Sequence, residues 1–453
     1  MVKRAIITAR LPRLDGRERP RSLISCGGLS LLERQLRQLA RAGIEEVCVL
    51  ALDFALEIGS ALQSMKKIPS TVALVQNPKE LMDLVRDGGD ILFLDDALLV
   101  DDRILKAVIH NEASTVLATD TKAVAVGFRA SENLLGADST EHFVGIAKLP
   151  SALISAQAPN APAGDFLTLL LQAANFEKDR VLFDISSLPL YLPDRRRDVP
   201  LLLHRVSEKE GAENGANALI AMAQKGTLDW PARFIHPFFE NLITKALLNT
   251  PVTPNQVTLV TGVFGFGATY LFATGHMLIA LAIALVLGVL DGVDGKLART
   301  KMLTSRVGEL EHILDKLVEY SWYFGIAFAL QRQGSDATVY SLALLIMLFA
   351  WSEVVLSEFF RRLSGVQLDD AGDFERKFRL IGGRRNTFFW SVIPFAIMDM
   401  WLAAMWFLAI YSILTTFVMQ WRFIVRVMDY TSSLSPIIAR NFRDSAYFPD
   451  KKK

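Results

Sequence analysis

DGVDGKLARTKMLTSRVGELEHILDK (291–316) follows the charge-free run MLIALAIALVLGVL (277–290), so acids appear abruptly at the end of an apolar segment. If one helix continues from that run into the stretch, Asp291 and Asp294 are three positions apart and share a helix face. We therefore expect their carboxylates to point toward a common centre.

A second pair of acids, Glu311 and Asp315, lies four positions apart on the next predicted helix and also shares a face. Converging carboxylates repel one another unless a cation lies among them, and their oxygens suit Mg²⁺, Mn²⁺ or Ca²⁺. Arg299, between the two pairs, supplies a planar cation suited to phosphate. The sequence therefore predicts a metal site formed by Asp291, Asp294, Glu311 and Asp315.

The same stretch resembles the signature of CDP-alcohol phosphotransferases, D-x2-D-G-x2-A-R-x8-G-x3-D-x3-D. Six positions are in register: Asp291, Asp294, Gly295, Ala298, Arg299 and Gly308. The strict spacing then places His312 and Lys316 where two Asp are expected. Removing one residue from the spacer restores an acid pair, Glu311 and Asp315, and we favour that register. The alternative interpretation is a set of interfacial charges that cap membrane helices.

The resemblance implies a reaction. An alcohol attacks the β-phosphorus of a CDP-alcohol, and CMP leaves. By carry-over, the four acids hold one or two Mg²⁺ or Mn²⁺ ions, and Asp315 also takes the proton of the acceptor hydroxyl. Gly295, Ala298 and Arg299 are expected to line the CDP site. Members of this family are often dimers, so a homodimer is an expectation.

Composition separates two halves. The chain has 453 residues and a net charge of +1, which argues against a nucleic-acid binder. Residues 1–250 have the character of a soluble protein, and residues 256–428 that of a membrane protein. The chain has two cysteines, which argues against a disulfide framework and fits a reducing cytosol. Because MVKRAIITARL lacks the long apolar core of a signal peptide, we expect the first half in the cytosol.

The N-terminal half has the pattern of a doubly wound α/β domain. Apolar runs at 4–10 and 46–52 predict buried strands, and Leu recurs at helical spacing over 29–43 between them. A strand, a helix and a second strand in this order open a sheet of parallel strands. Further apolar runs predict more strands of the same sheet, at 71–75, 91–94, 115–118 and 123–128.

This half resembles the sugar-nucleotide (NTP) transferase family, above all in SLLERQLRQLARAGIEEVCVL. In that family a Gly-rich loop cradles the nucleotide phosphates, but here Arg10 stands where a glycine is expected and Arg21 where a lysine is usual. The favoured register of ILFLDDALLVDD puts Ala97 at the metal-binding position; after a one-residue slip, Asp95 or Asp96 serves. We interpret the domain as nucleotidyltransferase-like and without catalysis, an assembly or regulatory module whose arginines can still bind an anion.

The C-terminal half is expected to be an all-α membrane domain. We place the nucleotidyltransferase-like domain at 1–217, an interfacial amphipathic helix and linker at 218–254, the membrane domain at 255–430 and a cytosolic tail at 431–453. The interfacial helix is predicted from Trp230 and Phe239 with basic neighbours, although an ordinary linker helix fits as well. Six helices are predicted, at 255–274, 276–299, 306–331, 337–362, 384–399 and 401–427.

Thr253 and Pro254 match the preferred cap and first-turn residues of the helix that opens the membrane domain. Basic loops then predict the orientation, with both termini in the cytosol and a multi-pass protein in the cytoplasmic membrane. The basic segment between the fourth and fifth helices is expected to bind an anionic acceptor such as a sugar phosphate, through Arg361, Arg379, Arg384 and Arg385. A loop resting on anionic lipid headgroups explains the same charges.

The two halves together resemble bifunctional enzymes that make CDP-inositol from CTP and inositol 1-phosphate and then transfer its phosphoinositol group. The leading interpretation is an integral-membrane CDP-alcohol phosphotransferase that uses CDP-diacylglycerol or a CDP-inositol-like donor in phospholipid or phosphoinositol synthesis. Its partners are the donor, an alcohol or phosphorylated polyol acceptor, and the lipid bilayer. One alternative is that both steps operate, with Asp95 or Asp96 holding Mg²⁺. The other is a non-catalytic membrane scaffold.

Overall fold

The computed structural model describes residues 2–14, 19–85, 88–122, 124–126, 142–159, 162, 165–303 and 308–431, without the side chains of 308–312, 430 and 431. The chain forms two compact units. The first consists of Met1–Leu192, Asp198–Met222 and Thr300–Met302, and the second of Pro193–Arg197, Ala223–Arg299 and Leu303–Lys453. The two units are described separately below. The predicted tail at 431–453 lies almost entirely outside the described residues.

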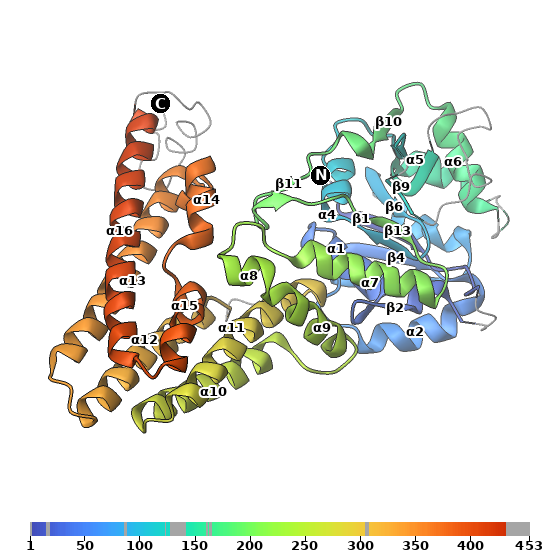
Figure 1. The fold of residues 1–453 in the computed structure, drawn as a ribbon. Coiled ribbons are helices and arrows are strands. Elements are labelled where there is room, and N and C mark those ends of the chain that lie inside the picture. The colour runs from blue at the N-terminus through green and yellow to red at the C-terminus, as the bar shows by residue number, and fades with distance from the viewer. Residues whose placement is uncertain are drawn as a thin grey trace. The chain divides into compact units, whose positions relative to one another are not determined.

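A seven-stranded sheet forms the centre of the first unit (Figure 1). Its strand order is β10-β8-β9-β6-β1-β4-β5, and only β9 runs antiparallel to its neighbours among the pairings described. The strands are β1 (Arg4–Thr8), β4 (Glu46–Leu50), β5 (Thr71–Val75), β6 (Asp90–Leu94), β8 (Val116–Asp120), β9 (His142–Pro150) and β10 (Val181–Asp184). Four of the predicted strand segments are thereby confirmed, and 115–118 overlaps β8.

Helices cover both faces of this sheet, because successive strand residues point to opposite sides. Ile7 of β1 belongs to one apolar cluster and Ile6 to the other. The Ile7 side is covered by α1 (Leu31–Arg41), α2 (Ala55–Ser64) and α4 (Asp102–Ile109). The Ile6 side is covered by α3 (Met82–Val85), α5 (Ser151–Gln157) and α6 (Phe166–Phe176). The predicted doubly wound α/β fold is confirmed.

The helix expected over 29–43 begins two residues late, because a tight hairpin precedes it. Strands β2 (Ser25–Cys26) and β3 (Leu29–Ser30) pair antiparallel across Gly27 and Gly28. Both glycines have positive φ, 64° and 81°, which a two-residue hairpin turn of this kind requires. Ser30 then caps α1 by accepting a hydrogen bond from the Glu33 backbone N–H.

One helix of the first unit was not predicted, and one predicted strand is wrong. Helix α7 (Lys209–Ala223) runs through a polar segment and buries Ala212 against Cys26, Leu31 and Leu99. The run at 123–128 is not a strand in the part of it that is described: Val126 makes an isolated bridge with His204. Polar residues on the outer face of α7 conceal its small buried residues in the sequence. The remaining short strands are β7 (Leu98–Val100), β11 (Tyr191–Leu192), β12 (Arg197–Asp198) and β13 (Leu203–Arg205).

Thr300–Met302 belong to the first unit because three arginines of α1 hold their backbone carbonyls. Arg34 donates to Thr300 O at 2.8 Å, Arg37 to Lys301 O at 3.1 Å and Arg41 to Met302 O at 3.0 Å. Burial lowers the pKa of the Arg34 guanidinium to about 10.

The second unit is helical. Its helices are α8 (Trp230–Phe234), α9 (His236–Leu248), α10 (Pro254–Ala273), α11 (Met277–Thr300, all but its last residue), α12 (Gly308–Arg332), α13 (Thr338–Ser364), α14 (Asp373–Ile381), α15 (Arg385–Ile397) and α16 (Trp401–Thr431). Each of the six helices predicted from 255 onward overlaps an observed one, with ends that differ by at most four residues. Helix α14 lies where only a loop was expected.

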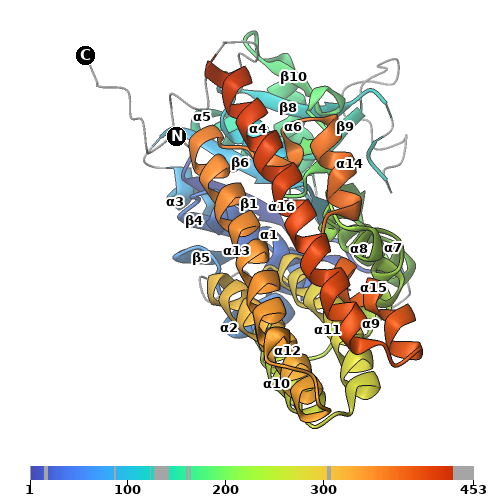
Figure 2. The ribbon, with the colours of Figure 1, turned by 60° about the vertical axis from the view of Figure 1, so that its left-hand side comes forward.

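Two helix pairs run side by side in both views, α10 with α12 and α13 with α16 (Figure 2). Small residues allow the first pair to approach closely, since a Cβ added at Gly265 of α10 would meet Val318 of α12 at 2.4 Å. At the start of α10, the Thr253 side chain accepts from Gln256 N and the Gln256 side chain accepts from Thr253 N, a capping box with Pro254 in the first turn. The predicted cap is confirmed.

Four helices within the described residues are long and apolar enough to cross a membrane: α10, α11, α13 and α16 up to Asp429. Their outward surfaces carry large exposed apolar side chains, such as Val263 on α10, Trp351 on α13 and Phe417 on α16. The chain is therefore a membrane protein. Helices α12 and α15 do not meet the same test, so a six-span domain stays a prediction.

Candidate active site

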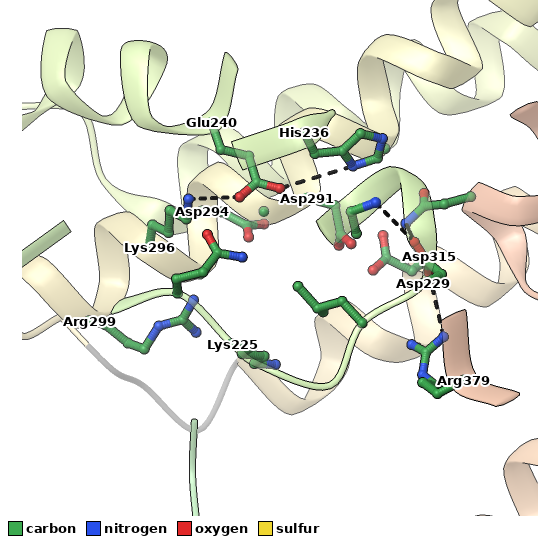
Figure 3. A pocket seen from close by; sticks show the side chains of 17 residues that line it. Lys225, Asp229, His236, Glu240, Asp291, Asp294, Lys296, Arg299, Asp315 and Arg379 are labelled. Atoms are coloured by element: carbon green, nitrogen blue, oxygen red, sulfur yellow. Dashed lines mark hydrogen bonds and ion pairs between the residues drawn. The ribbon is translucent and has the colours of Figure 1, made fainter. Parts of the chain in front are cut away.

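One pocket of about 350 Å³ in the second unit collects most of the charged residues that the sequence indicates. We call it the acidic pocket (Figure 3). Helix α11 forms its floor, and the linker before α8, the helices α8 and α9, and single residues of α12, α14 and α15 complete it. Its lining residues are Gln224, Lys225, Leu228, Asp229, Ala232, His236, Glu240, Gly288, Asp291, Gly292, Asp294, Gly295, Lys296, Arg299, Asp315, Arg379 and Asn386.

Three of the four predicted metal-binding acids line this pocket. Asp291 and Asp294 come from α11, and Asp315 comes from α12. Asp294 is almost completely buried and accepts a hydrogen bond from the Thr258 hydroxyl of α10 at 2.9 Å. These three acids therefore line one cavity, whereas their convergence on a common metal ion stays a prediction.

Arg385, at the start of α15, lies between two of these acids. Its guanidinium donates to Asp291 Oδ2 at 2.7 Å and approaches Asp315 Oδ1 at 3.4 Å. A guanidinium between two carboxylates offsets their mutual repulsion, as a metal ion would. The predicted substrate-binding role of Arg385 stays a prediction, and its observed contacts are with the acids.

The donor set suits a divalent metal in kind, because three carboxylates face one cavity and hard cations prefer such oxygens. Among the described residues, no three His, Cys, Asp or Glu side chains are grouped closely enough to form a ready metal centre. The fourth predicted ligand, Glu311, lies among the residues whose side chains are not described. The metal site therefore stays a prediction.

Glycines on α11 let neighbouring side chains approach its backbone. A Cβ at Gly292 would lie 2.3 Å from the Glu240 carboxylate, and one at Gly288 would lie 2.8 Å from Asn386 Oδ1. At Gly295, a residue predicted to line the CDP site, a Cβ would meet the Arg299 guanidinium at 3.1 Å. Gly295 and Arg299 line the acidic pocket, whereas Ala298 is not among its lining residues.

Helix α9 contributes a polar wall that sequence reasoning missed. Glu240 is buried and forms an ion pair with Lys296 of α11 at 2.9 Å, and Lys296 also donates to Asn241 Oδ1 at 2.6 Å. His236, also buried, accepts a hydrogen bond from Trp390 Nε1 at 3.3 Å. Burial raises the pKa of Glu240, against the opposing effect of the Lys296 charge, and burial lowers the pKa of His236.

The outer face of α9 carries several large apolar residues, beside the exposed polar residues Asn241 and Lys245. Phe238 is 71% exposed and Leu242 is 62% exposed, while the polar residues His236, Glu240 and Thr244 are buried at intervals of four. An ordinary helix of a soluble protein instead buries its apolar residues and exposes its polar ones. The four-residue interval between His236, Glu240 and Thr244 is the sequence pattern from which this polar wall could have been predicted. Reversed polarity is what a helix lying on a membrane surface above a polar site would show.

The four predicted acceptor-binding arginines lie in different surroundings. Arg379 lines the pocket, 3.6 Å from Asp229 Oδ2 and 3.2 Å from Asp369 Oδ2. Arg384 pairs with Glu353 and Asp369 and does not line the pocket. Arg361 is exposed on α13 and pairs with Glu358 of its own helix at 2.7 Å. The structure therefore places Arg379 in the pocket lining and Arg385 against Asp291 and Asp315. Arg384 shares Asp369 with Arg379, and Arg361 lies on the exposed side of α13.

In the first unit, Asp95 and Asp96 lie just beyond β6, at the carboxyl ends of the parallel strands. Asp95 accepts from the Thr8 hydroxyl at 2.9 Å and from Arg205 at 2.6 Å. Asp96 is buried and accepts from Leu11 N at 2.6 Å; burial raises the pKa of its carboxyl to about 7. Ala97 is fully buried with φ 54° and has no ligand atom in its side chain, so the acids beside it are the groups that could hold a cation.

Comparison with known proteins identifies relatives of both halves. The model of the CDP-alcohol phosphatidyltransferase family matches residues 251–418. The inner membrane protein YnjF of Escherichia coli is 31% identical over 154 residues, which cover 33% of this chain and 73% of that protein. The bifunctional IPC transferase and DIPP synthase of Thermococcus kodakarensis is 29% identical over 187 residues, 40% of each chain, so the match spans less than half of that relative.

A protein of the same name from Rubrobacter xylanophilus is 24% identical over 339 residues, 68% of this chain and 73% of that protein. An alignment of this length must extend from the segment 251–418 into the N-terminal half. The residues of the acidic pocket that precede position 251, including Lys225, His236 and Glu240, lie outside the segment that the family model matches.

Proposed function

Because the chain belongs to the CDP-alcohol phosphatidyltransferase family, we propose that it moves a phospho-alcohol group from a CDP-alcohol to an acceptor hydroxyl and releases CMP, and that either the transferred group or the acceptor is an inositol phosphate. That the protein is a phosphotransferase follows from the family. The inositol phosphate class rests on the relatives named IPC transferase and DIPP synthase. Either CDP-inositol or CDP-diacylglycerol fits this proposal as the donor.

One observation carries the proposal: three acids and one arginine of the family signature line the same pocket as a further arginine. Asp291, Asp294 and Asp315 face the same cavity as Arg299 and Arg379. A diphosphate needs cations around it, and a reacting hydroxyl needs a nearby carboxylate to accept its proton. The acidic pocket offers both.

In the proposed reaction, the acceptor oxygen forms a bond to the β-phosphorus of the donor. The bond from that phosphorus to the bridging oxygen breaks, and CMP leaves with its electron pair. Asp315 takes the proton of the acceptor hydroxyl. Arg299 and the low surface at Gly295 receive the CDP diphosphate, and Arg379 faces an anionic acceptor.

Enzymes of this family generally use a divalent metal. Asp291, Asp294, Glu311 and Asp315 would hold Mg²⁺ or Mn²⁺ here. When bound, such an ion neutralises the diphosphate and stabilises the charge that develops on the leaving CMP.

The proposed location is the cytoplasmic membrane, with both termini in the cytosol and the acidic pocket near the cytosolic surface. The apolar surfaces of α10, α11, α13 and α16 support insertion. The reversed polarity of α9 supports a position at the headgroups, with Phe238 and Leu242 toward lipid. A homodimer is part of the proposal on family grounds alone.

A second candidate function is synthesis of the CDP-alcohol from CTP by the first unit. The observation in its favour is that Asp95 and Asp96 both stand at the carboxyl end of β6, where doubly wound sheets bind ligands. The test is CTP- and inositol 1-phosphate-dependent release of pyrophosphate by the full chain. Release that persists in Asp315→Asn and disappears in Asp95→Asn or Asp96→Asn would assign it to the first unit; no release would exclude it.

The experiment for the main proposal is CMP release by the purified protein with Mg²⁺ or Mn²⁺. CDP-diacylglycerol and CDP-inositol are offered in parallel, each with inositol, inositol 1-phosphate and glycerol 3-phosphate. Metal-dependent CMP from a pair that includes an inositol phosphate group is the expected result. CMP only from CDP-diacylglycerol with glycerol 3-phosphate would retain the enzyme class and overturn the inositol phosphate class.

A further inference from the structure

The linker before α8 places a cation in the acidic pocket. Lys225 lines the cavity and is exposed to it, and Figure 3 draws Lys225 and Arg299 on one side of the pocket with Glu240 and Asp294 on the other. Position 225 precedes residues 251–418, so the family signature does not account for it.

The backbone around Lys225 is held on both sides. Gly226 N donates to Arg195 O at 2.7 Å, and Arg197 Nε donates to Gln224 O at 3.0 Å. A Cβ at Gly226 would lie 2.6 Å from Arg196 O, so only glycine permits this approach. The loop is thus fixed in place before any ligand arrives, which reduces the entropic cost of binding.

The linker is also fixed to the second unit downstream of Lys225. Thr227 Oγ1 donates to Asp370 Oδ1 at 2.6 Å, and Asp229 caps α8 by accepting from Ala232 N at 3.1 Å. These contacts hold the linker where its lysine faces the cavity. A lysine in a mobile loop would contribute only a diffuse charge.

The other lysine and one arginine of the acidic pocket each form an ion pair with an acid of the protein. Lys296 pairs with Glu240 at 2.9 Å, and Arg379 pairs with Asp369 at 3.2 Å. Within the part of the chain that the structure describes, Lys225 makes no hydrogen bond or ion pair. Its ammonium group therefore has three donors available for a ligand.

Cations surround Lys225. Burial lowers the pKa of the Lys225 ammonium group, and the nearby charges of Arg299, Arg196 and Arg195 lower it further, whereas the Asp291 carboxylate opposes them. Like charges that lie near one another repel, and an anion placed among them relieves that repulsion. The charge on this side of the pocket is thus positive, whereas Glu240 and Asp294 make the other side negative (Figure 3).

We propose that Lys225 is a phosphate-binding residue of this enzyme, supplied by the linker outside the family signature, and that it binds either the diphosphate of the CDP-alcohol or the phosphate of a phosphorylated acceptor. The inference rests on the proposed function for the identity of these ligands. The ammonium group acts as a mobile point charge beside the fixed guanidinium of Arg299.

The test is calorimetric titration of the full-length protein in detergent with CDP, and separately with inositol 1-phosphate and unphosphorylated inositol. We compare wild type with Lys225→Gln, Lys225→Arg and the control Lys245→Gln, which removes an exposed lysine of α9 outside the pocket. Lys225→Gln is expected to lower the affinity for one of the phosphate-bearing probes by about tenfold. Lys225→Arg should lower it much less, and Lys245→Gln should leave it unchanged.

The probe whose affinity falls in Lys225→Gln identifies the source of the phosphate. Weaker binding of CDP indicates the donor diphosphate. Weaker binding of inositol 1-phosphate, with binding of inositol unchanged, indicates the acceptor phosphate. Equal affinity of wild type and Lys225→Gln for every probe overturns the inference, and so does equal weakening in Lys245→Gln or an absence of binding to wild type. CMP release by the wild type, measured in parallel, tests the proposed function separately. Release without any effect of Lys225 contradicts the inference alone.

Discussion

The acidic pocket and the edge of the sheet beyond β6 both contain neighbouring aspartates, in different surroundings. In the pocket, Asp291 and Asp315 share the Arg385 guanidinium and face an open cavity. At the sheet edge, Asp95 is paired with Arg205, and Asp96 is buried with a backbone N–H as its described partner. The aspartates of the acidic pocket thus face a space that a ligand can enter, whereas those at the sheet edge are bonded to other groups of the protein.

This contrast teaches that acids alone do not identify a reactive site. What distinguishes the acidic pocket is the combination of carboxylates, cations and space, whereas the described part of the sheet edge offers carboxylates in close contact with their own chain. Substitutions that alter one of the two sites and leave the other intact test this contrast directly.

The largest expected effect is at Asp294. Asp294→Asn keeps an oxygen that can accept from Thr258 and removes the negative charge from the pocket. CMP release is expected to fall by about 10³-fold, because the charge, and not the side-chain shape, is required for metal and diphosphate binding. Steady-state CMP release measures this, with circular dichroism as the check on folding. Asp95→Asn is the matched change at the sheet edge and should leave CMP release within about twofold of wild type.

A smaller effect is expected from the packing of α9 on α11. Gly292→Ala places a methyl group 2.3 Å from the Glu240 carboxylate, so the polar wall must shift. We expect CMP release to fall by about tenfold and the thermal midpoint to drop. The control is Gly267→Ala on α10, where an added Cβ meets nothing within 4 Å. Equal behaviour of the two variants would contradict the role assigned to the wall.

The smallest effect on catalysis is expected from Asp96→Asn, which should change stability instead. The folded-state pKa of Asp96 is raised to about 7 from 3.8, so the native state disfavours its charged form. That penalty is absent below pH 4, grows by about 1.4 kcal/mol per pH unit up to pH 7, and is then constant. Asp96→Asn should therefore stabilise the first unit more at pH 8 than at pH 5. Thermal unfolding at the two pH values measures this, and a stabilisation that is equal at both would show that the carboxyl is not desolvated.

Much of the fold could be predicted from the sequence because its signals are local. Hydrophobic runs gave the strands of the sheet, and the spacing of charges and caps placed α10 to α13 within a few residues. The signature around Asp291 and Asp294 predicted which helix carries the site. Helix α7 was missed because its buried side is made of small residues such as Ala212.

The rest of the pocket could not be predicted, because it depends on contacts between distant parts of the chain. Arg385 meets Asp291 across 94 positions, and Lys296 meets Asn241 across 55. Arginines in a basic loop look alike in sequence, so the different partners of Arg361, Arg379, Arg384 and Arg385 could not be predicted from it. The spacing of polar residues in α9 was the only local trace of the wall.

The most direct test of the account is CMP release by wild type and Asp315→Asn across a Mg²⁺ titration, with the donor and acceptor pair that the wild type turns over. The account predicts metal-dependent CMP release by the wild type and about a 10³-fold lower rate in Asp315→Asn, with folding unchanged. Full activity in Asp315→Asn would contradict the assignment of this carboxylate, and a folded wild type that releases no CMP from any pair would contradict the proposed reaction.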